Sequence, residues 1–225
     1  MLRNLYTSAR RFSSIQKRIL VAVANGSEEL ETVAIMDILR RTGVARVDLA
    51  KVDTNKNQEN ALLKTNSLLS EMSRGVLIQA DKHIDDLDQS QLNLYDCFVV
   101  PGGHTGAETI GANKKVWEII EDFIMEQKLI GAICAAPMVL HNHKLLKGFG
   151  DATCYPAFKS KFDQGTTIWQ DQPVVVNKNL ITSQGPGTAI EFSLKLVEAM
   201  FGPEKAKEVG DPLVLKASKG LFKEY

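Results

Sequence analysis

The sequence predicts an α/β domain with a doubly wound, mostly parallel β-sheet and helices on both of its faces. Short continuous apolar runs alternate along the chain with longer segments of helical periodicity, and turn residues separate the two. Such apolar runs are typical of strands buried on both faces, as in parallel sheets. Their alternation with helices indicates the α/β class. The 225 residues, 44% of them hydrophobic and 24% charged, suit one globular domain.

The first half of the chain begins with a buried strand at 18–25, which a helix follows. Ser27 is a favourable N-cap, an apolar stripe covers 30–38, and Gly43 ends the helix. Residues 53–70 are polar and lack clear periodicity, so we interpret them as a surface insertion. Three more strands are predicted in this half, at 46–52, 75–80 and 95–100.

The second half continues the alternation. Apolar spacing predicts a long helix from about Gly106 to Gln127, which Gly111 interrupts. The elements predicted after it are a strand at 129–133, a helix to about residue 146, a strand at 151–155, a hairpin of 166–169 and 173–176, a strand at 179–184 and a helix at 189–201. The tail from Gly202 to Tyr225 has mixed character, and we interpret it as a short C-terminal extension.

The chain is organised around a cysteine at the junction of a strand and a helix. The apolar run 129–133 stops at Cys134, and Pro137 follows in a first helical turn, where its missing N–H breaks no hydrogen bond. A side chain on such a bend is lifted out of the sheet, and the helix N-terminus favours a thiolate. We therefore interpret Cys134 as a nucleophile or redox centre.

Residues that follow the other strand ends are candidate partners of this cysteine, because reactive groups gather beyond the carboxyl ends of the strands in a doubly wound sheet. Glu31 is placed to point from the first helix toward this edge. Glu28 and Glu29 are interpreted as acids that stabilise the helix dipole on a solvated face. The N–H groups of Gly102 and Gly103 are candidates for an oxyanion site.

The histidines and the other cysteines give weaker signals. His104 is either an acid/base at the mouth of the site or a surface histidine. His141 and His143 lie two residues apart on a helix, so they face different ways and do not form a metal pair. Cys97 is interpreted as a packing residue, and Cys154 as either a resolving thiol or an inert one. Since no nucleotide-binding loop follows the first strand either, we expect no metal and no cofactor.

Charge and hydropathy argue against several classes of partner. The 27 basic residues equal the 27 acidic ones, which gives no reason to expect nucleic acid. No apolar run approaches the roughly 20 residues that span a bilayer. Three scattered cysteines are too few for a disulfide framework and fit a reducing compartment.

The N-terminal segment 1–14 has the composition of a mitochondrial transit peptide. It contains three arginines and several hydroxyl residues but no acidic residue. Arg10-Arg11-Phe12-Ser13 resembles a matrix-processing site. We therefore expect a mitochondrial protein, in the matrix, whose residues 15–225 form a single domain.

Four segments, in order and at suitable spacing, carry a resemblance to a known family: 26–32 (GSEELET), 99–103 (VVPGG), 132–137 (AICAAP) and 183–192 (SQGPGTAIEF). Over roughly 18–216, the chain resembles the ThiJ/PfpI superfamily, in the branch of the Parkinson disease protein 7 proteins. The resemblance implies a flavodoxin-like fold, usually a homodimer, and a reactive cysteine, here Cys134, hydrogen-bonded to a glutamate, here Glu31. The resemblance also implies that backbone N–H groups near Gly102 and Gly103 line the pocket. We expect Ala135, His104 and Tyr155 to complete that pocket.

One residue departs from the pattern of the superfamily. Many relatives carry a histidine before a proline where this chain has Tyr155-Pro156. Because the unperturbed pKa of tyrosine is about 10, it is a poor base near neutral pH, which weakens a hydrolase interpretation.

Three functional hypotheses remain for the sequence. The leading one is cofactor-independent detoxification of small dicarbonyls, in which methylglyoxal is converted to lactate by the glyoxalase or deglycase activity of the superfamily. The second is a cysteine-based redox sensor or chaperone. The third is a structural subunit of a larger mitochondrial protein assembly.

Overall fold

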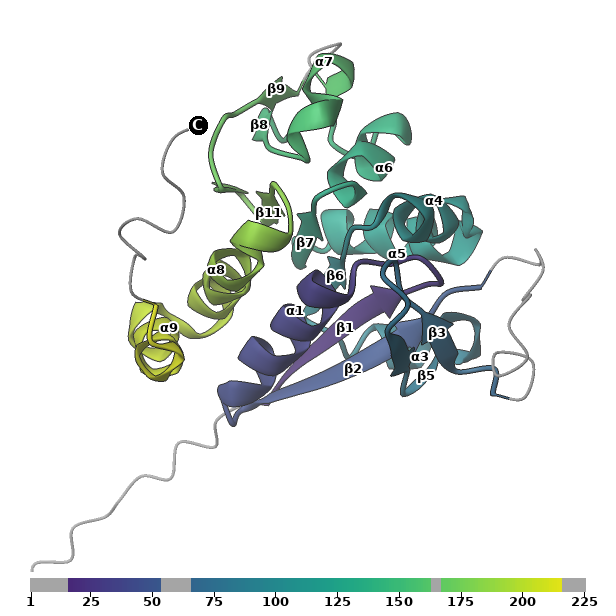
Figure 1. The fold of residues 1–225 in the computed structure, drawn as a ribbon, viewed down its shortest axis with the longest axis horizontal. Coiled ribbons are helices and arrows are strands. Elements are labelled where there is room, and N and C mark those ends of the chain that lie inside the picture. The colour runs from purple at the N-terminus through teal and green to yellow at the C-terminus, as the bar shows by residue number, and fades with distance from the viewer. Residues whose placement is uncertain (1–15, 54–65, 163–166, 216–225) are drawn as a thin grey trace, which may run out of the picture.

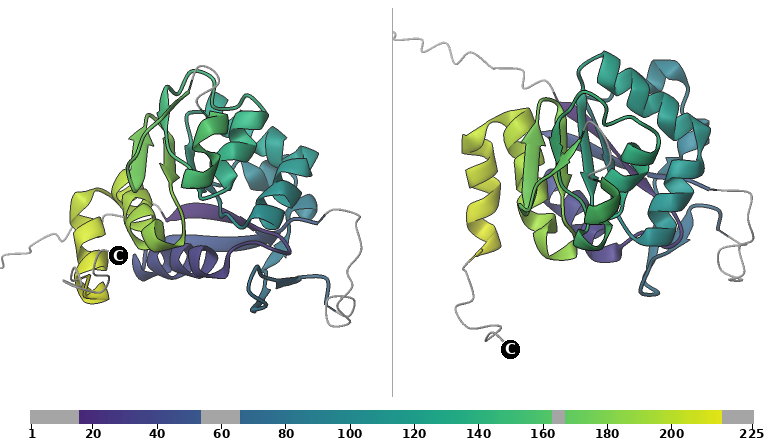
Figure 2. Two further views of the ribbon diagram at one scale, coloured as in Figure 1. Left: turned by 45° about the horizontal axis from the view of Figure 1, so that its top comes forward. Right: turned by 90° about the horizontal axis from the view of Figure 1, so that it is seen from above.

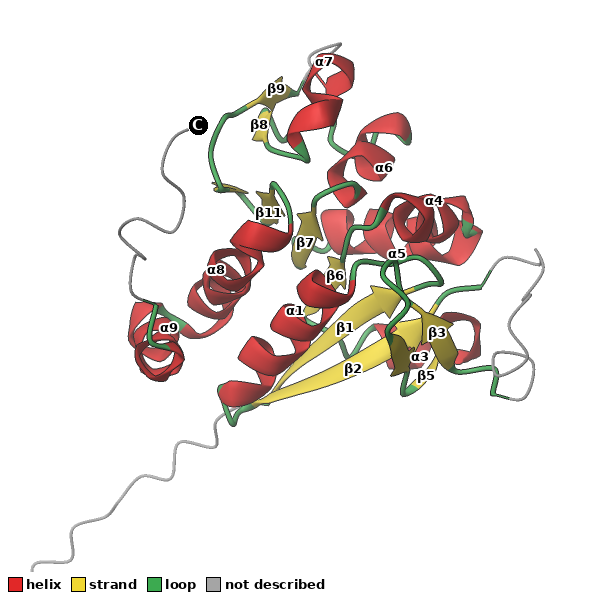
Figure 3. Ribbon diagram, viewed as in Figure 1, coloured by secondary structure: helices red, strands yellow, loops and turns green. Residues whose placement is uncertain are grey.

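In the computed structural model, which describes residues 16–53, 66–162 and 167–215, a seven-stranded sheet lies between two layers of helices (Figures 1 and 3). The spatial order of its strands is β10 (Val174–Asn177), β11 (Leu180–Ser183), β7 (Leu129–Ile133), β6 (Cys97–Val100), β1 (Lys17–Val23), β2 (Ala45–Lys51) and β5 (Lys82–His83). Only β10 in this sheet pairs antiparallel with its neighbour. The order β2-β1-β6-β7-β11 is that of a flavodoxin-like fold, which confirms the predicted class.

The two faces of the sheet are covered by different helices (Figure 2). One face carries α1 (Glu29–Arg41) and α8 (Ala189–Phe201), with α9 (Pro203–Gly210) packed on α8. The other carries α3 (Gln89–Leu92), α4 (His104–Ala112), α5 (Lys114–Met125) and α6 (Ala136–Asn142). Successive residues of β1 point to opposite faces, so that Ile19 and Val21 join one buried cluster and Leu20 and Ala22 the other. Both faces are therefore apolar, as the continuous runs predicted.

The long helix predicted over 106–127 is two helices, and the break differs from the expected one. Asn113, not Gly111, separates α4 from α5, since its side chain accepts hydrogen bonds from the N–H groups of Lys115 and Val116 as the N-cap of α5. Gly111 has a packing role instead, because a Cβ there would lie 2.2 Å from a methyl carbon of Val139 on α6.

Two other predicted elements pair differently from the expectation. The strand expected at 75–80 is not in the main sheet, because β4 (Leu77–Gln79) pairs with β3 (Leu69–Glu71) in a separate hairpin. The prediction of a hairpin between 166–169 and 173–176 is wrong. β9 (Ile168–Trp169) pairs in parallel with β8 (Asp151–Ala152), whereas β10 pairs with β11. Apolar alternation identifies a strand, but not its partner.

Several boundaries also differ from the predicted ones. The helix expected to reach residue 146 ends at Asn142, and the left-handed φ of 60° at Lys144 turns the chain away. The strand at 151–155 stops after Ala152, because the N–H of Thr153 donates to the side chain of Thr182 instead. A further short helix, α7 (Lys159–Phe162), was not predicted.

The ends of the chain and the centre of the predicted insertion lie outside the described residues. This applies to the predicted transit peptide at 1–14 and to residues 54–65 and 216–225. The last residues of the insertion, 66–70, are described and include the start of β3. The ammonium group of the fully buried Lys51 holds this segment, because it donates to the carbonyl oxygens of Ser67 and Leu69 at 2.8 and 2.7 Å. Among the described helices, none has the length and apolar character of a membrane span.

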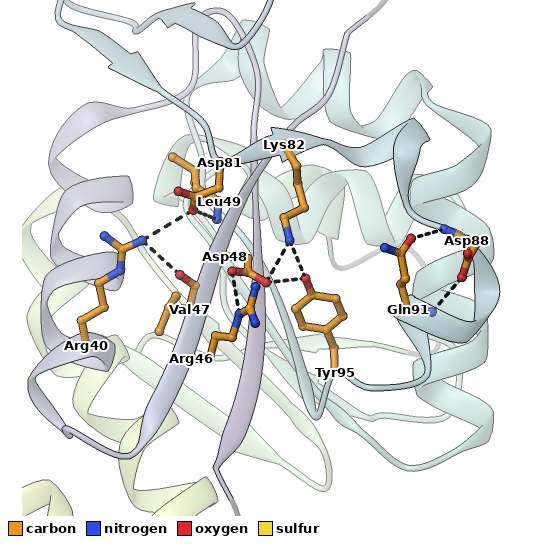
Figure 4. Close-up of polar contacts among 10 residues, drawn as sticks. All are labelled: Arg40, Arg46, Val47, Asp48, Leu49, Asp81, Lys82, Asp88, Gln91 and Tyr95. Carbon is orange, nitrogen blue, oxygen red and sulfur yellow. Dashed lines mark hydrogen bonds and ion pairs between the residues drawn. The ribbon is translucent and has the colours of Figure 1, made fainter.

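A polar network fastens β2 to β5 and to the segment that leads into β6 (Figure 4). Asp48 accepts hydrogen bonds from the hydroxyl of Tyr95 at 2.6 Å, from Lys82 at 3.0 Å and from Arg46 at 3.2 Å. Burial acts to raise the pKa of Asp48, but these three donors outweigh it and lower the pKa. The carboxylate therefore stays ionised and holds this side of the sheet together.

Candidate active site

The site lies at the carboxyl edge of the sheet, where the loops after β1 and β6 pack closely against each other. The N–H of Glu28 donates to the carbonyl oxygen of Gly102 at 3.0 Å. Gly103 has a φ of 82°, and a Cβ at this residue would lie 2.2 Å from the carbonyl oxygen of Gly26. Because both the backbone conformation and the space require glycine there, the glycine pair brings the start of α1 next to the end of β6.

Cys134 occupies the predicted bend between β7 and α6. Its φ of 64° lies in the left-handed region, which a residue with a side chain adopts at a cost of about 1–3 kcal/mol. The bend is held on both sides, since its N–H donates to Ser183 O at 2.9 Å and its carbonyl oxygen accepts from Tyr155 N at 2.8 Å. The backbone strain expected of a nucleophile elbow is therefore present.

Glu31 reaches this cysteine from the first turn of α1. Its side chain is completely buried, and Oε2 accepts a hydrogen bond from the N–H of Gly102 at 2.7 Å. A Cβ at Gly102 would lie 2.4 Å from Cβ of Cys134, 2.9 Å from Sγ and 2.8 Å from Oε2 of Glu31. The carboxyl, the thiol and the glycine therefore meet around one small space.

The electrostatics of the pair differ from those predicted for an isolated elbow. Burial raises the pKa of Glu31 to about 7, against the opposing hydrogen bonds from Gly102 and Cys134. Burial and the negative charge of Glu31 raise the pKa of the Cys134 thiol, although the N–H groups of Gly103 and Ala135 act in the opposite direction. While Glu31 is ionised, burial and its negative charge together outweigh the stabilisation of a thiolate that the helix N-terminus was expected to give.

Protonation of Glu31 changes this balance. Two acidic groups in contact resist ionising together, so the pair favours one negative charge over two. When the carboxyl is neutral, it no longer repels a thiolate and can donate a hydrogen bond to it. The same group can then return as a base, because a pKa near the operating pH suits proton transfer in both directions.

Glu28 and Glu29 were predicted to lie on a solvated face, and this prediction is wrong, because both bind neighbouring groups of the protein. Glu28 is the N-cap of α1, in place of Ser27, and its carboxylate accepts from the N–H of Glu31 at 2.7 Å. Glu29 binds the loop after β3, through the Ser73 hydroxyl and the N–H of Arg74, both at 2.7 Å. Both acids therefore fix the position of the helix that carries Glu31.

The other predicted pocket residues contribute mainly through their backbones. The N–H of Gly102 is engaged by Glu31, so that Gly103 and Ala135 are the residues whose N–H groups face the sulfur. Tyr155 is exposed, and its N–H supports the elbow. His104 is exposed at the start of α4, where its Nε2 lies 3.4 Å from Glu108.

A pocket that the sequence analysis did not predict adjoins the elbow, and we call it the side pocket. It has a volume of about 110 Å³ and lies between α4, α6 and the short segment Pro156–Phe158. Its lining residues are His104, Ala107, Glu108, Ala135, Met138, Val139, Asn142, Phe158 and Lys161. No motif marks these residues in the sequence, since they come from three separate segments with ordinary helical spacing. Within the described ranges, no three His, Cys, Asp or Glu side chains are grouped so that they could hold a metal ion.

Comparison with known proteins gives the family of this fold and site. The family model described as DJ-1/PfpI family matches residues 17–199, which include Glu31, the glycine pair and Cys134. The chain belongs to the DJ-1/PfpI family. This confirms the resemblance stated on the four sequence segments.

Three similar proteins illustrate the extent of the match. Protein DJ-1 homolog B of Arabidopsis thaliana is 40% identical over 85% of this chain, which spans only 40% of that longer protein. The glutathione-independent glyoxalase DJ-1 of Schizosaccharomyces pombe is 31% identical, and the match covers 85% of this chain and 95% of the yeast protein. The structure of an oxidized DJ-1 from Toxoplasma gondii is 38% identical, with a TM-score of 0.75 over 88% of this chain and 97% of that one.

Proposed function

We propose that this DJ-1/PfpI protein is a glyoxalase of the deglycase type, which converts small dicarbonyls such as methylglyoxal to hydroxy acids without a cofactor. The observation that carries the proposal is the meeting of the buried Glu31 carboxyl with the Cys134 thiol at the elbow. A relative that this chain covers over 95% of its length is named a glutathione-independent glyoxalase, which supports the same activity.

The reaction begins with addition of the sulfur to the aldehyde carbon. The thiolate of Cys134 forms the carbon–sulfur bond, and the neutral Glu31 carboxyl gives its proton to the aldehyde oxygen, which becomes the hydroxyl of a hemithioacetal. The N–H groups of Gly103 and Ala135 stabilise negative charge beside the sulfur while this happens.

The second stage moves a proton between adjacent carbons. Glu31, now a carboxylate, removes the proton from the carbon bonded to sulfur and delivers it to the neighbouring carbon, while the hydroxyl proton on the first carbon passes to the oxygen of the neighbouring carbon, so that the hemithioacetal becomes a thioester of the 2-hydroxy acid. Water then hydrolyses the thioester and restores the thiol. The sum is one dicarbonyl and one water to one hydroxy acid, with no net oxidation.

The proposal is tested by measuring lactate formation from methylglyoxal in the presence of EDTA. Wild-type protein is expected to turn over, and Cys134→Ala and Glu31→Gln are expected to lose at least about a hundredfold in kcat/KM. Cys97→Ala is the matched control, because that thiol is fully buried at the start of β6. Absence of turnover by wild type, or turnover that survives Cys134→Ala, would overturn the proposal.

A second candidate function, a redox sensor or chaperone, is favoured by the relative exposure of the thiols. Cys134 is 9% exposed, whereas Cys97 and Cys154 are completely buried. Since peroxide oxidises accessible thiols first, mild peroxide should convert Cys134 selectively to the sulfinate, as intact and peptide mass spectrometry would show. Equal oxidation of all three thiols would argue against this function.

The proposal also includes the homodimer and the mitochondrial address that the sequence predicts. A surface groove of about 510 Å³ between α1 and the β3–β4 hairpin includes the exposed side chains of Val33 and Leu77, and such a surface suits a second copy of the chain. Light scattering of the purified protein tests the dimer, and native electrophoresis of mitochondrial extracts distinguishes it from a subunit of a larger assembly.

The mitochondrial address is tested by microscopy, which compares the location of the full chain with that of a variant without residues 1–14.

A further inference from the structure

The side pocket adjoins the elbow through Ala135 and His104. Ala135, which lines it, follows Cys134 in the chain, and His104 follows Gly103. The N–H groups of Gly103 and Ala135 are the two that face the sulfur. Because Ala135 belongs both to the surroundings of the sulfur and to the lining, the pocket lies close to the place where a substrate bonded to Cys134 has to lie.

The interior of the pocket is apolar, and its rim is neutral overall. Ala107, Ala135 and Met138 are buried, and the Phe158 ring closes one side. The polar members of the lining, His104, Glu108, Asn142 and Lys161, are all exposed residues. Such a lining suits an uncharged hydrocarbon group, because burying a charge or a polar group there would remove it from water without a partner.

The charges at the rim are already engaged with neighbouring groups. His104 lies 3.4 Å from Glu108, and its ring stacks on Phe158 with the centroids 5.8 Å apart. The ammonium group of Lys161 lies 5.7 Å from the centroid of the same phenyl ring. Because Lys161 and Glu108 carry opposite formal charges, the rim gives little net attraction for an anionic substrate.

We propose that the side pocket binds the carbon substituent of a 2-oxoaldehyde, and that it selects a branched alkyl group over hydrogen, methyl and phenyl. This inference rests on the proposed function, because it names the substrate class of the same site. In the hemithioacetal the first atom of the substituent is three bonds from the sulfur, which fits a pocket that starts one residue beyond Cys134.

The size of the pocket sets the preferred substituent. A cavity of about 150 Å³ accommodates benzene, so that the 110 Å³ present here suits a group somewhat smaller than phenyl. Each buried methylene contributes about fourfold to binding. Two additional carbons should therefore raise kcat/KM about fifteenfold when isopropylglyoxal replaces methylglyoxal.

The experiment compares kcat/KM for glyoxal, methylglyoxal, isopropylglyoxal and phenylglyoxal, measured as hydroxy-acid formation. Two variants change the pocket in opposite directions. Asn142→Trp fills it from an exposed position at the end of α6, and Met138→Ala enlarges it. The matched control is Met125→Trp, since Met125 is 72% exposed at the end of α5.

The expected result is the highest kcat/KM for isopropylglyoxal in wild type and in the control. Asn142→Trp should lower the ratio of isopropylglyoxal to glyoxal at least about fivefold, and Met138→Ala should raise the ratio of phenylglyoxal to isopropylglyoxal. A ranking that is flat, or that neither pocket variant changes, would overturn this inference while the glyoxalase activity stands. Absence of turnover with all four aldehydes would overturn the proposed function and the inference together.

Discussion

Replacing Glu31 by glutamine should change the pH dependence of stability as well as activity. The folded state raises the pKa of this completely buried carboxyl from 4.5 to about 7. At about 1.4 kcal/mol per pKa unit, the shift corresponds to about 3 kcal/mol. Glutamine keeps an oxygen that can accept from the N–H of Gly102 but has no proton to lose in this range.

The direction follows from the sign of the shift. Below pH 4.5 the carboxyl is neutral in both the folded and the unfolded protein, so the folded state carries no penalty for it. As the pH rises toward 7, the unfolded chain loses the proton while the folded chain keeps it, and wild-type stability falls. Between pH 5 and pH 8, wild type should lose about 2–3 kcal/mol relative to Glu31→Gln.

Urea denaturation of both proteins at half-unit steps from pH 5 to pH 8, with a reductant present, measures this difference. Taking the difference between the two proteins cancels the titration of all groups that they share. The control is Glu121→Gln, because that glutamate is exposed on α5. A free-energy difference between wild type and Glu31→Gln that stays constant over this range would refute the burial and the raised pKa of Glu31.

Three further substitutions test other parts of the structure. Gly102→Ala places a Cβ 2.4 Å from Cys134, so it should lower kcat/KM by about a hundredfold and stability by about 1–3 kcal/mol, whereas Gly187→Ala, at a glycine with open space around it, should change neither. Tyr95→Phe removes the 2.6 Å hydrogen bond to Asp48 and should cost about 1–3 kcal/mol in urea denaturation without changing kcat/KM, and an equal loss of activity would contradict the separation of this network from the site. Lys51→Met leaves the carbonyl oxygens of Ser67 and Leu69 without their donor and should cost about 1–3 kcal/mol; the exposed Lys147→Met is its control, and equal midpoints for the two variants would count against this role.

The sequence predicted the fold class because the central strands are buried on both faces. The strands β1, β6, β7 and β11 pair in parallel, and the alternation of strands and helices along the sequence is enough to predict this orientation. The short edge elements carry no such constraint. β4 and β9 are only three and two residues long, so that nothing in their composition distinguishes the main sheet from a separate pair.

The site was predictable to the extent that glycine and proline mark it. The residue types alone indicate the bend at Cys134 and the turn at Gly102 and Gly103, and both lie where expected. The roles of Glu28 and Glu29 were missed, because acids at a helix start look alike whether they face water or bind a neighbouring loop. The side pocket was missed for the related reason that Phe158 approaches α4 only through tertiary packing.

Gly102 connects the separate segments of this site. Its carbonyl oxygen accepts from Glu28, its N–H donates to Glu31, and its Cα lies so close to Cys134 that no side chain fits. The end of β6 thereby sets the distance between the carboxyl on α1 and the thiol after β7. Glu31 and Cys134 are more than a hundred positions apart in the chain. The glycine between them is what makes them one acid–base pair, and it explains why the activity proposed here should depend as strongly on Gly102 as on the two side chains that it separates.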